Sequence, residues 1–167
     1  MMENELTLLI GGNVGDRLFY LQKTVDLLSE RLGKVIKKSS IYETAAWGFE
    51  SEDFYNMALV LKTELNPSDC LSITQDIEIE IGRKEKSKIG HYSARCMDID
   101  LMFYNQLVYQ DERLSIPHPK IQERKFVLIP LNEIMNWYIH PQELKSIGEL
   151  LSECTDQSEV KKINEHI

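Results

Sequence analysis

The hydrophobic positions change their period along the chain, and each period predicts an element of secondary structure. A short apolar run, residues 6–10, stops at a Gly-Gly-Asn turn and predicts a buried first strand. Apolar positions then recur at steps of three and four, which predicts one buried face of a helix: Leu18, Leu21, Val25, Leu28 and Leu32. Asp16 can cap the start of this helix, and Gly33 can end it.

Two further strands and a second helix follow. Residues 35–44 and 54–63 are predicted to form the second and third strands. Asn66 as the cap and Pro67 as the first helical residue predict the start of the second helix, and Gly82 its end.

The C-terminal third of the chain predicts helices and a loose tail. Residues 123–132 predict a short helix that Pro130 breaks or delays, and residues 146–154 predict another helix. The polar tail from Thr155 onward is expected to be loosely held.

The order of elements, β-α-β-β-α-β with a helical C-terminal extension, defines a fold class. It predicts an α+β protein with a ferredoxin-like split βαβ arrangement, in which helices pack on one face of an antiparallel sheet. At 167 residues, the whole chain, 1–167, is predicted to be one domain.

A fourth strand, residues 95–104, carries two carboxylates. Alternate residues of a strand point to opposite faces, so Asp98 and Asp100 should lie side by side while the residues between and beside them face the core. Two like charges at this spacing repel, and one or two Mg²⁺ ions with substrate phosphates would relieve the repulsion. The alternative is a solvated pair of carboxylates at the edge of a sheet.

Basic residues lead into this strand, although the chain as a whole carries a net charge of -8. The segment between Gly82 and the carboxylates contains one acidic residue, Glu85, and five basic residues: Arg83, Lys84, Lys86, Lys88 and Arg95. Such a segment suits a metal-bound polyphosphate, and we expect residues 82–94 to be a mobile loop that nucleotide orders. A solvated charged loop without a ligand is the alternative.

Composition restricts the partners and the location. The acidic balance argues against general binding of nucleic acid, and no apolar run approaches the length of a membrane span. The acidic N-terminus has no signal-peptide pattern, and the three cysteines are widely spaced without a metal-ligand grouping. We therefore expect a cytoplasmic protein with reduced thiols, no nucleic-acid or membrane partner, and a monomeric state.

Two segments together resemble 6-hydroxymethyl-7,8-dihydropterin pyrophosphokinases, a family of folate-pathway enzymes. They are Arg95-Cys-Met-Asp98-Ile-Asp100 and Arg113-Leu-Ser-Ile-Pro-His118-Pro, the latter followed by Arg124 and Phe126. The likeness runs from Gly11 to about Trp137 and implies transfer of pyrophosphate from ATP to the pterin hydroxymethyl group, with release of AMP.

The resemblance also implies the roles of individual residues. Asp98 and Asp100 would bind two Mg²⁺ ions, and with Arg83 and Arg95 they would form the catalytic group. The ATP site would consist of Gln75, Glu78, Arg83, Arg95, Leu101, Arg113, Ser115, His118 and Arg124. The pterin site would consist of Thr44, Ala45, Phe54, Asn56 and Phe126, with the two phenylalanines on the faces of the ring.

This sequence departs from the family pattern in two loops. Thr44-Ala45-Ala46-Trp47 lacks the prolines that often follow the threonine, and the segment before Arg95 lacks the usual Trp-Gly-Pro-Arg run. No role is therefore carried over to residues 84–94, and either Asp100 or a metal-bound water could accept the hydroxyl proton. The alternative functions are another metal-dependent nucleotidyl or phosphoryl transferase on the same fold, and a non-catalytic nucleotide- or RNA-binding module.

Overall fold

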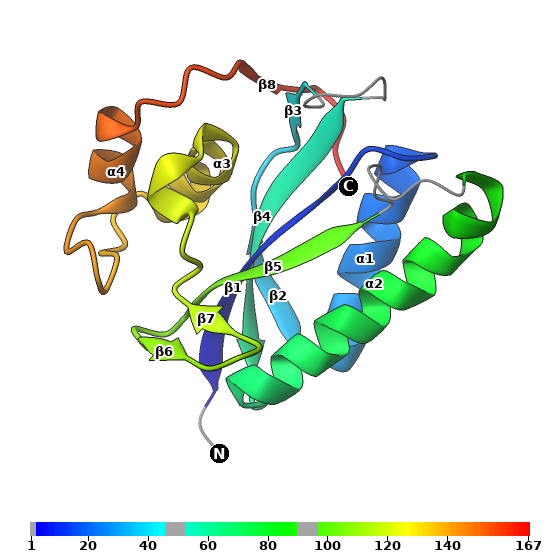
Figure 1. Cartoon of the computed structure of the whole chain (residues 1–167), viewed down its shortest axis with the longest axis horizontal. Coiled ribbons are helices and arrows are strands. Elements are labelled where there is room, and N and C mark those ends of the chain that lie inside the picture. The colour runs from blue at the N-terminus through cyan, green and yellow to red at the C-terminus, as the bar shows by residue number, and fades with distance from the viewer. Residues whose placement is uncertain (1–2, 46–52, 90–96) are drawn as a thin grey trace.

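The computed structural model describes residues 3–45, 53–89 and 97–167, and the side chains of residues 83–89 are outside this description. Within these residues, six strands form one antiparallel sheet (Figure 1). The strands are β1 Asn4–Gly12, β2 Lys34–Lys38, β3 Tyr42–Thr44, β4 Phe54–Thr63, β5 Asp98–Tyr104 and β8 Val160–Lys162. Their order is β5-β1-β4-β3-β8, and β2 pairs with β4 alongside β3.

The described helices cover both faces of this sheet. They are α1 Arg17–Arg31, α2 Pro67–Ile89, α3 Lys125–Met135 and α4 Ile147–Glu153. Figure 1 shows α1 and α2 together on one side of the sheet and α3 and α4 on the other. The ferredoxin-like α+β fold is thus confirmed, since α1 and α2 share one face of the sheet. The helices of the C-terminal extension, α3 and α4, cover the other face, where their own apolar sides are buried.

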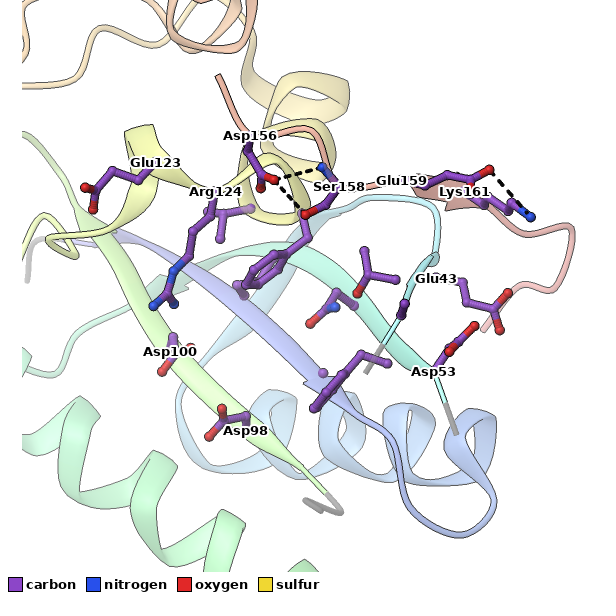
Figure 2. A pocket seen from close by; sticks show the side chains of 18 of the residues that line it. Glu43, Asp53, Asp98, Asp100, Glu123, Arg124, Asp156, Ser158, Glu159 and Lys161 are labelled. Carbon is purple, nitrogen blue, oxygen red and sulfur yellow. Dashed lines mark hydrogen bonds and ion pairs between the residues drawn. The ribbon is translucent and has the colours of Figure 1, made fainter. Parts of the chain in front are cut away.

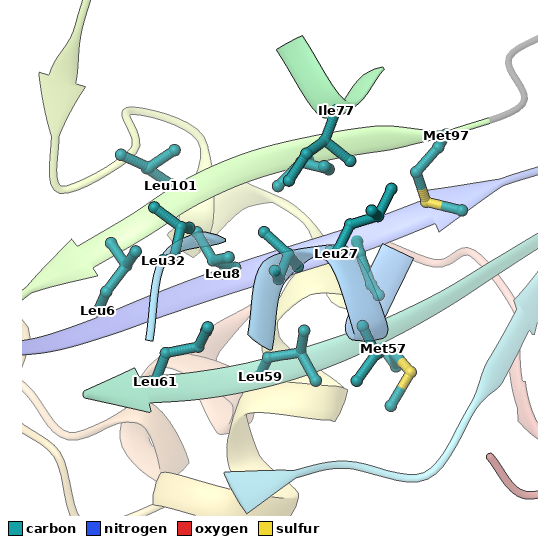
Figure 3. Packing of buried hydrophobic residues seen from close by; sticks show 14 of the residues in the cluster. Leu6, Leu8, Leu27, Leu32, Met57, Leu59, Leu61, Ile77, Met97 and Leu101 are labelled. Atoms are coloured by element: carbon teal, nitrogen blue, oxygen red, sulfur yellow. The ribbon is translucent and has the colours of Figure 1, made fainter. Parts of the chain in front are cut away.

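Each face of the sheet has its own hydrophobic core. Leu8 of β1, Leu59 of β4 and Leu101 of β5 point toward α1 and α2 (Figure 3). Leu9 and Ala58, one residue away in their strands, point toward α3 and α4. Because strand neighbours alternate between faces, the pairing register decides which residues enter each core.

A β-bulge changes the alternation in β5. Opposite β1, Thr7 pairs with Phe103 while Leu8 pairs with Leu101, so Met102 is the additional residue. Met102 and Phe103 therefore both lie in the core of the second face. Before the bulge, Ile99 and Leu101 lie in the first core, which leaves Asp98 and Asp100 on the second face, as their spacing predicts.

The starts of α1 and α2 follow the predicted capping residues, and α4 also begins with a side-chain cap. The Asp16 side chain accepts the N–H of Phe19 at 3.1 Å at the start of α1. Asn66 accepts the N–H of Asp69 at 2.8 Å at the start of α2. Ser146 begins α4 with a reciprocal capping box that involves Glu149. Capping residues are local, and this explains why sequence alone locates these helix starts.

The predicted second strand, residues 35–44, is divided into β2 and β3. At the division, Ser39 donates its N–H to Ala58 and accepts the Ala58 N–H on its hydroxyl. Glu133 of α3 accepts from the N–H and hydroxyl of Ser40 and, at 2.6 Å, from the hydroxyl of Tyr42. This carboxylate holds the division against α3, a long-range contact that no local pattern signals.

The predicted end of the second helix and the predicted loose tail are both wrong. Helix α2 continues past Gly82 to Ile89, and a Cβ at Gly82 would meet nothing within 4 Å. Residues 83–89 are therefore helical rather than a loop, whereas residues 90–94 lie outside the described residues. The tail from Thr155 is also not loose, because it joins the sheet as β8 on β3.

Two short elements complete the path between β5 and α3. The strands β6 Tyr109–Gln110 and β7 Ser115–Ile116 form a hairpin, and the 3-10 turn η1 Ile121–Glu123 precedes α3. Of the helices in the described ranges, none combines the length and the apolar character needed to cross a bilayer.

His140 gives the fold a testable dependence on pH. Its side chain is buried edge-on against Phe103, and its Nδ1 accepts the N–H groups of Gln142 and Glu143. Burial lowers the pKa of His140 below 6.5, although the Glu143 carboxylate opposes this shift. The unfolded chain therefore binds a proton that the folded chain rejects, so stability is full above pH 6.5 and falls as the pH drops below it.

We expect His140→Asn, which keeps an acceptor near the position of Nδ1, to reduce this loss of stability. The measurement is the free energy of unfolding in urea between about pH 7.5 and pH 5 for both proteins. Both proteins contain His118, so its contribution to the pH dependence cancels in the difference between the two curves. Parallel curves would show that His140 does not contribute to the pH dependence.

Candidate functional site

The second face of the sheet holds a cavity of about 910 Å³. It lies at the N-terminal end of α3, whose residues Phe126 and Val127 line it. The floor comes from three adjacent strands: Leu9 and Gly11 of β1, Asn56 of β4, and Asp98, Asp100 and Met102 of β5. The walls come from four segments: Glu43, Thr44 and Ala45; Asp53 and Phe54; His118, Glu123, Arg124, Phe126 and Val127; and Asp156, Ser158, Glu159 and Lys161.

One row of residues crosses the floor from one end to the other. Gly11 pairs with Asn56 on one side and with Asp98 on the other. A Cβ at Gly11 would lie 2.0 Å from Oδ1 of Asn56 and 2.8 Å from the backbone oxygen of Tyr55. Only glycine therefore leaves room for the Asn56 amide, which is buried in the floor.

Asp98 and Asp100 lie on the same face of β5, and both are half-buried in the cavity. The strand is at the edge of the sheet, and the carboxylate of Glu78 in α2 accepts the N–H of Ile99 at 2.7 Å. This bond fixes β5 at the residue between the two aspartates. Figure 2 shows the guanidinium of Arg124 pointing from α3 toward the same end of the cavity.

His118 is held in one protonation state beside these carboxylates. Its ring Nδ1 accepts the backbone N–H of Lys120 at 3.1 Å. The backbone N–H of His118 donates to the backbone oxygen of Met102 at 3.0 Å. Burial lowers the pKa of His118, the nearby Arg124 and Lys120 charges lower it further, and Asp98 opposes them. The ring is therefore neutral at pH 7 and carries its proton on Nε2, which makes Nε2 a hydrogen-bond donor.

Aromatic and polar side chains form the other end of the cavity. Phe54 at the start of β4 and Phe126 in the first turn of α3 both line it, together with Thr44 and Ala45. Asn56 supplies amide groups to the floor between them. A flat, polar-edged molecule would find apolar faces and hydrogen-bonding groups here.

The structure brings together nine of the predicted site residues. The cavity is lined by Thr44, Ala45, Phe54, Asn56, Asp98, Asp100, His118, Arg124 and Phe126. The other residues predicted for the ATP site lie elsewhere or outside the description. Arg113 contacts Ser72 and Gln75 on α2 at 3.2 and 3.3 Å, and Ser115 begins the adjacent strand β7.

Leu101 does not line the cavity. Its side chain is 4% exposed and packs in the first core, because it alternates with Asp100 along β5. Glu78 of α2 accepts the N–H of Ile99 and does not line the cavity either. The side chain of Arg83 and all of Arg95 lie outside the described residues.

Sequence reasoning missed the C-terminal lining residues. Asp156, Ser158, Glu159 and Lys161 lie in a polar segment with no hydrophobic period, so the sequence gives no signal that it reaches the cavity. Gly11 belongs to the predicted Gly-Gly-Asn turn, but the sequence does not show which residue it contacts. Its partner, Asn56, can be identified only from the pairing register.

The fold and the cavity together define a ferredoxin-like α+β protein with a small-molecule site on its sheet. Residues 7–136 match the model of the family described as 7,8-dihydro-6-hydroxymethylpterin-pyrophosphokinase (HPPK). The chain belongs to this family and is an enzyme of the pyrophosphokinase class.

Curated relatives agree with this assignment, and a solved structure shares the fold. The chain is similar to the 2-amino-4-hydroxy-6-hydroxymethyldihydropteridine pyrophosphokinase of Porphyromonas gingivalis, with 42% identity over 137 residues that cover 80% of this chain and 91% of the relative. The protein of the same description from Bacillus subtilis is also 42% identical, over 135 residues that cover 80% and 79%. A Plasmodium falciparum HPPK-DHPS structure shares the fold, with a TM-score of 0.72 and 18% identity, across 91% of this chain but 43% of the solved chain.

Gly11→Ala tests the close approach in the floor. We expect the added methyl to displace Asn56 and to lower the free energy of unfolding by about 1–3 kcal/mol. The matched control is Gly82→Ala, where space is open and helix propensity predicts a gain of up to about 1 kcal/mol. Urea denaturation of both variants measures the two effects, and a Gly11→Ala protein as stable as the wild type would contradict the geometry.

Proposed function

We propose that this chain transfers the pyrophosphoryl group of ATP to the hydroxymethyl oxygen of 6-hydroxymethyl-7,8-dihydropterin and releases AMP. The observation that carries the proposal is the cavity itself, which joins a carboxylate and arginine end to an aromatic and amide end on one strand row. Membership of the HPPK family supports the same reaction.

We assign the carboxylate end to the triphosphate of ATP. The Arg124 guanidinium offers a planar set of donors to phosphate oxygens, and neutral His118 offers one further N–H. Arg113, which donates to Gln75 of α2 at 3.3 Å outside the cavity lining, is proposed with Gln75 to contact the rest of the nucleotide. Arg83 and Arg95 are proposed as further phosphate ligands from the basic segment.

We assign the aromatic end to the pterin. Phe54 and Phe126 would contact the two faces of the ring, and Asn56 would pair with its hydrogen-bonding edge. Thr44 and Ala45 would border the same end. The floor row then sets the distance between the pterin and the nucleotide, because Asn56 and Asp98 flank Gly11.

The donor set at Asp98 and Asp100 fits Mg²⁺, of which we propose two ions. Two carboxylates, completed by substrate phosphate oxygens, are a usual Mg²⁺ environment. In the described parts of the chain, no group of three or more His, Cys, Asp or Glu side chains could hold a metal ion unaided. This agrees with ions that arrive with the nucleotide, and their charge would offset the negative charge of the polyphosphate.

The reaction is then a direct displacement. The hydroxymethyl group gives up its proton, for which Asp100 or a bound water is the proposed acceptor, and its oxygen bonds to the β-phosphorus. The bond from that phosphorus to the oxygen bridging the α-phosphate breaks, and AMP leaves with that oxygen. Asp98 and Asp100 would hold the cations, Arg124 would take up charge on the phosphate oxygens, and the two aromatic side chains would align the acceptor. We further expect a monomer in the cytoplasm.

The test of the function is a product assay with the purified chain, ATP, Mg²⁺ and 6-hydroxymethyl-7,8-dihydropterin. We expect equal amounts of AMP and pterin diphosphate, and none with 6-methyl-7,8-dihydropterin, which lacks the attacking oxygen. ADP as the product would indicate a different phosphoryl transferase. The absence of any turnover would favour a binding module.

Asp98→Asn and Asp100→Asn should each remove catalysis while keeping the fold. Losing a metal-binding carboxylate costs several kcal/mol of transition-state stabilisation, so kcat should fall at least about 100-fold. The control is Asp26→Asn, an exposed carboxylate on α1 that accepts from Gln22. Either site variant with near wild-type kcat in Mg²⁺ would show that its carboxylate is not needed for metal binding.

Asn56→Ala should weaken pterin binding far more than ATP binding. The pterin edge would lose its partner in a buried floor, a loss of about 1–3 kcal/mol. Calorimetric titration with each ligand, using a non-hydrolysable ATP analogue, separates the two affinities. Equal losses for both ligands would place Asn56 outside the pterin site.

A further inference from the structure

The C-terminal strap, which we define as residues 155–163, forms one wall of the cavity. It leaves α4, passes the start of α3 and joins the sheet edge as β8 (Figure 1). Its side chains at Asp156, Ser158, Glu159 and Lys161 line the cavity (Figure 2). The matched family model ends at residue 136, so the strap lies outside it.

At its first end, the strap caps α3. The N-cap residue of α3, Arg124, is extended and makes no side-chain capping bond. Asp156 supplies the cap from a distance, because its Oδ2 accepts the N–H of Lys125 at 2.9 Å. Its Oδ1 accepts the N–H and the hydroxyl of Ser158 at 2.9 and 2.6 Å. The carboxylate is therefore held by the strap and in turn holds the first turn of α3.

At its other end, the strap binds the strand that carries Thr44. Val160 pairs with Thr44, and Lys162 pairs with Tyr42. The N–H of Ile163 donates to Ile41 at 3.0 Å, which extends the pairing by one residue. The strap thus connects the α3 wall of the cavity to the β3 wall.

We propose that the strap is part of the substrate site and that Asp156 is a positioning residue for Arg124 and Phe126. Lys125, whose N–H Asp156 binds, lies between these two lining residues in the sequence, so the cap sets the direction in which both side chains leave the helix. Asp156 itself need not touch either substrate. This proposal rests on the proposed function only for the identity of the ligands.

The test uses Asp156→Ala and the milder Asp156→Asn in the full chain. Misplacement of the binding groups should raise the dissociation constant of the hydroxymethyl pterin, measured with Mg²⁺ and a non-hydrolysable ATP analogue, about 10-fold for Asp156→Ala. Asp156→Asn keeps one acceptor oxygen and should show a smaller increase. The matched control is Glu149→Gln, which alters the capping carboxylate of α4 away from the cavity and should leave pterin affinity within about twofold.

Two results would overturn the proposal. The first is a lower melting temperature for Asp156→Ala with unchanged pterin affinity well below that temperature, which would mean a structural role alone. The second is unchanged hydrogen exchange at the Lys125 amide without ligand, which would show that Asp156 does not cap α3. The exchange readout does not require turnover, so it distinguishes failure of this proposal from failure of the proposed reaction in the wild-type protein.

Discussion

Pairing of β1 with β4 on one side and with β5 on the other puts Asn56, Gly11 and Asp98 in one row. A slip of one residue between β1 and β5 would turn Asp98 and Asp100 into the core beneath α1 and α2, where unpaired carboxylates are costly, and would turn Leu101 toward the cavity. A slip of one residue between β1 and β4 would turn Asn56 out of the cavity floor in the same way. The hydrophobic cores and the site are therefore stabilised by a single register, and neither can change without the other.

The charge of the cavity explains why its ligand should bring cations. The described lining holds seven carboxylates: Glu43, Asp53, Asp98, Asp100, Glu123, Asp156 and Glu159. Two lining residues, Arg124 and Lys161, are permanently cationic. A polyphosphate without counterions would be repelled by this surface, whereas a magnesium-bound one would find ligands in it. The basic segment 83–95 precedes the carboxylate strand in the sequence.

The sequence predicts those parts of this molecule that depend on local physics. Alternation along the β5 segment predicts that Asp98 and Asp100 share a face, and the capping residues Asp16 and Asn66 locate helix starts. The prediction that Gly82 ends the second helix is wrong because a glycine in a helix costs only about 1 kcal/mol. Helix propensity on both sides of the glycine can offset this cost. The division between β2 and β3 depends on Glu133, nearly a hundred residues away, and therefore has no local signal.

The candidate site follows the same rule. Nine of the residues that the family resemblance identifies meet in one cavity, and the C-terminal strap does not belong to that pattern. Asp156 and β8 become visible only when the long-range hydrogen bonds to α3 and β3 are known. Leu101 shows the converse case, since its place beside Asp100 in the sequence puts its side chain on the opposite face of the strand.

We propose that one strand row holds both substrates at a fixed separation. The most direct test is a crystal structure of the complex with Mg²⁺, a non-hydrolysable ATP analogue and hydroxymethyl-dihydropterin. We expect the pterin between Phe54 and Phe126 with its edge on Asn56, the triphosphate at Asp98 and Asp100, and the hydroxymethyl oxygen in line with the β-phosphorus. A pterin bound away from Asn56, or a triphosphate bound away from the two aspartates, would contradict it.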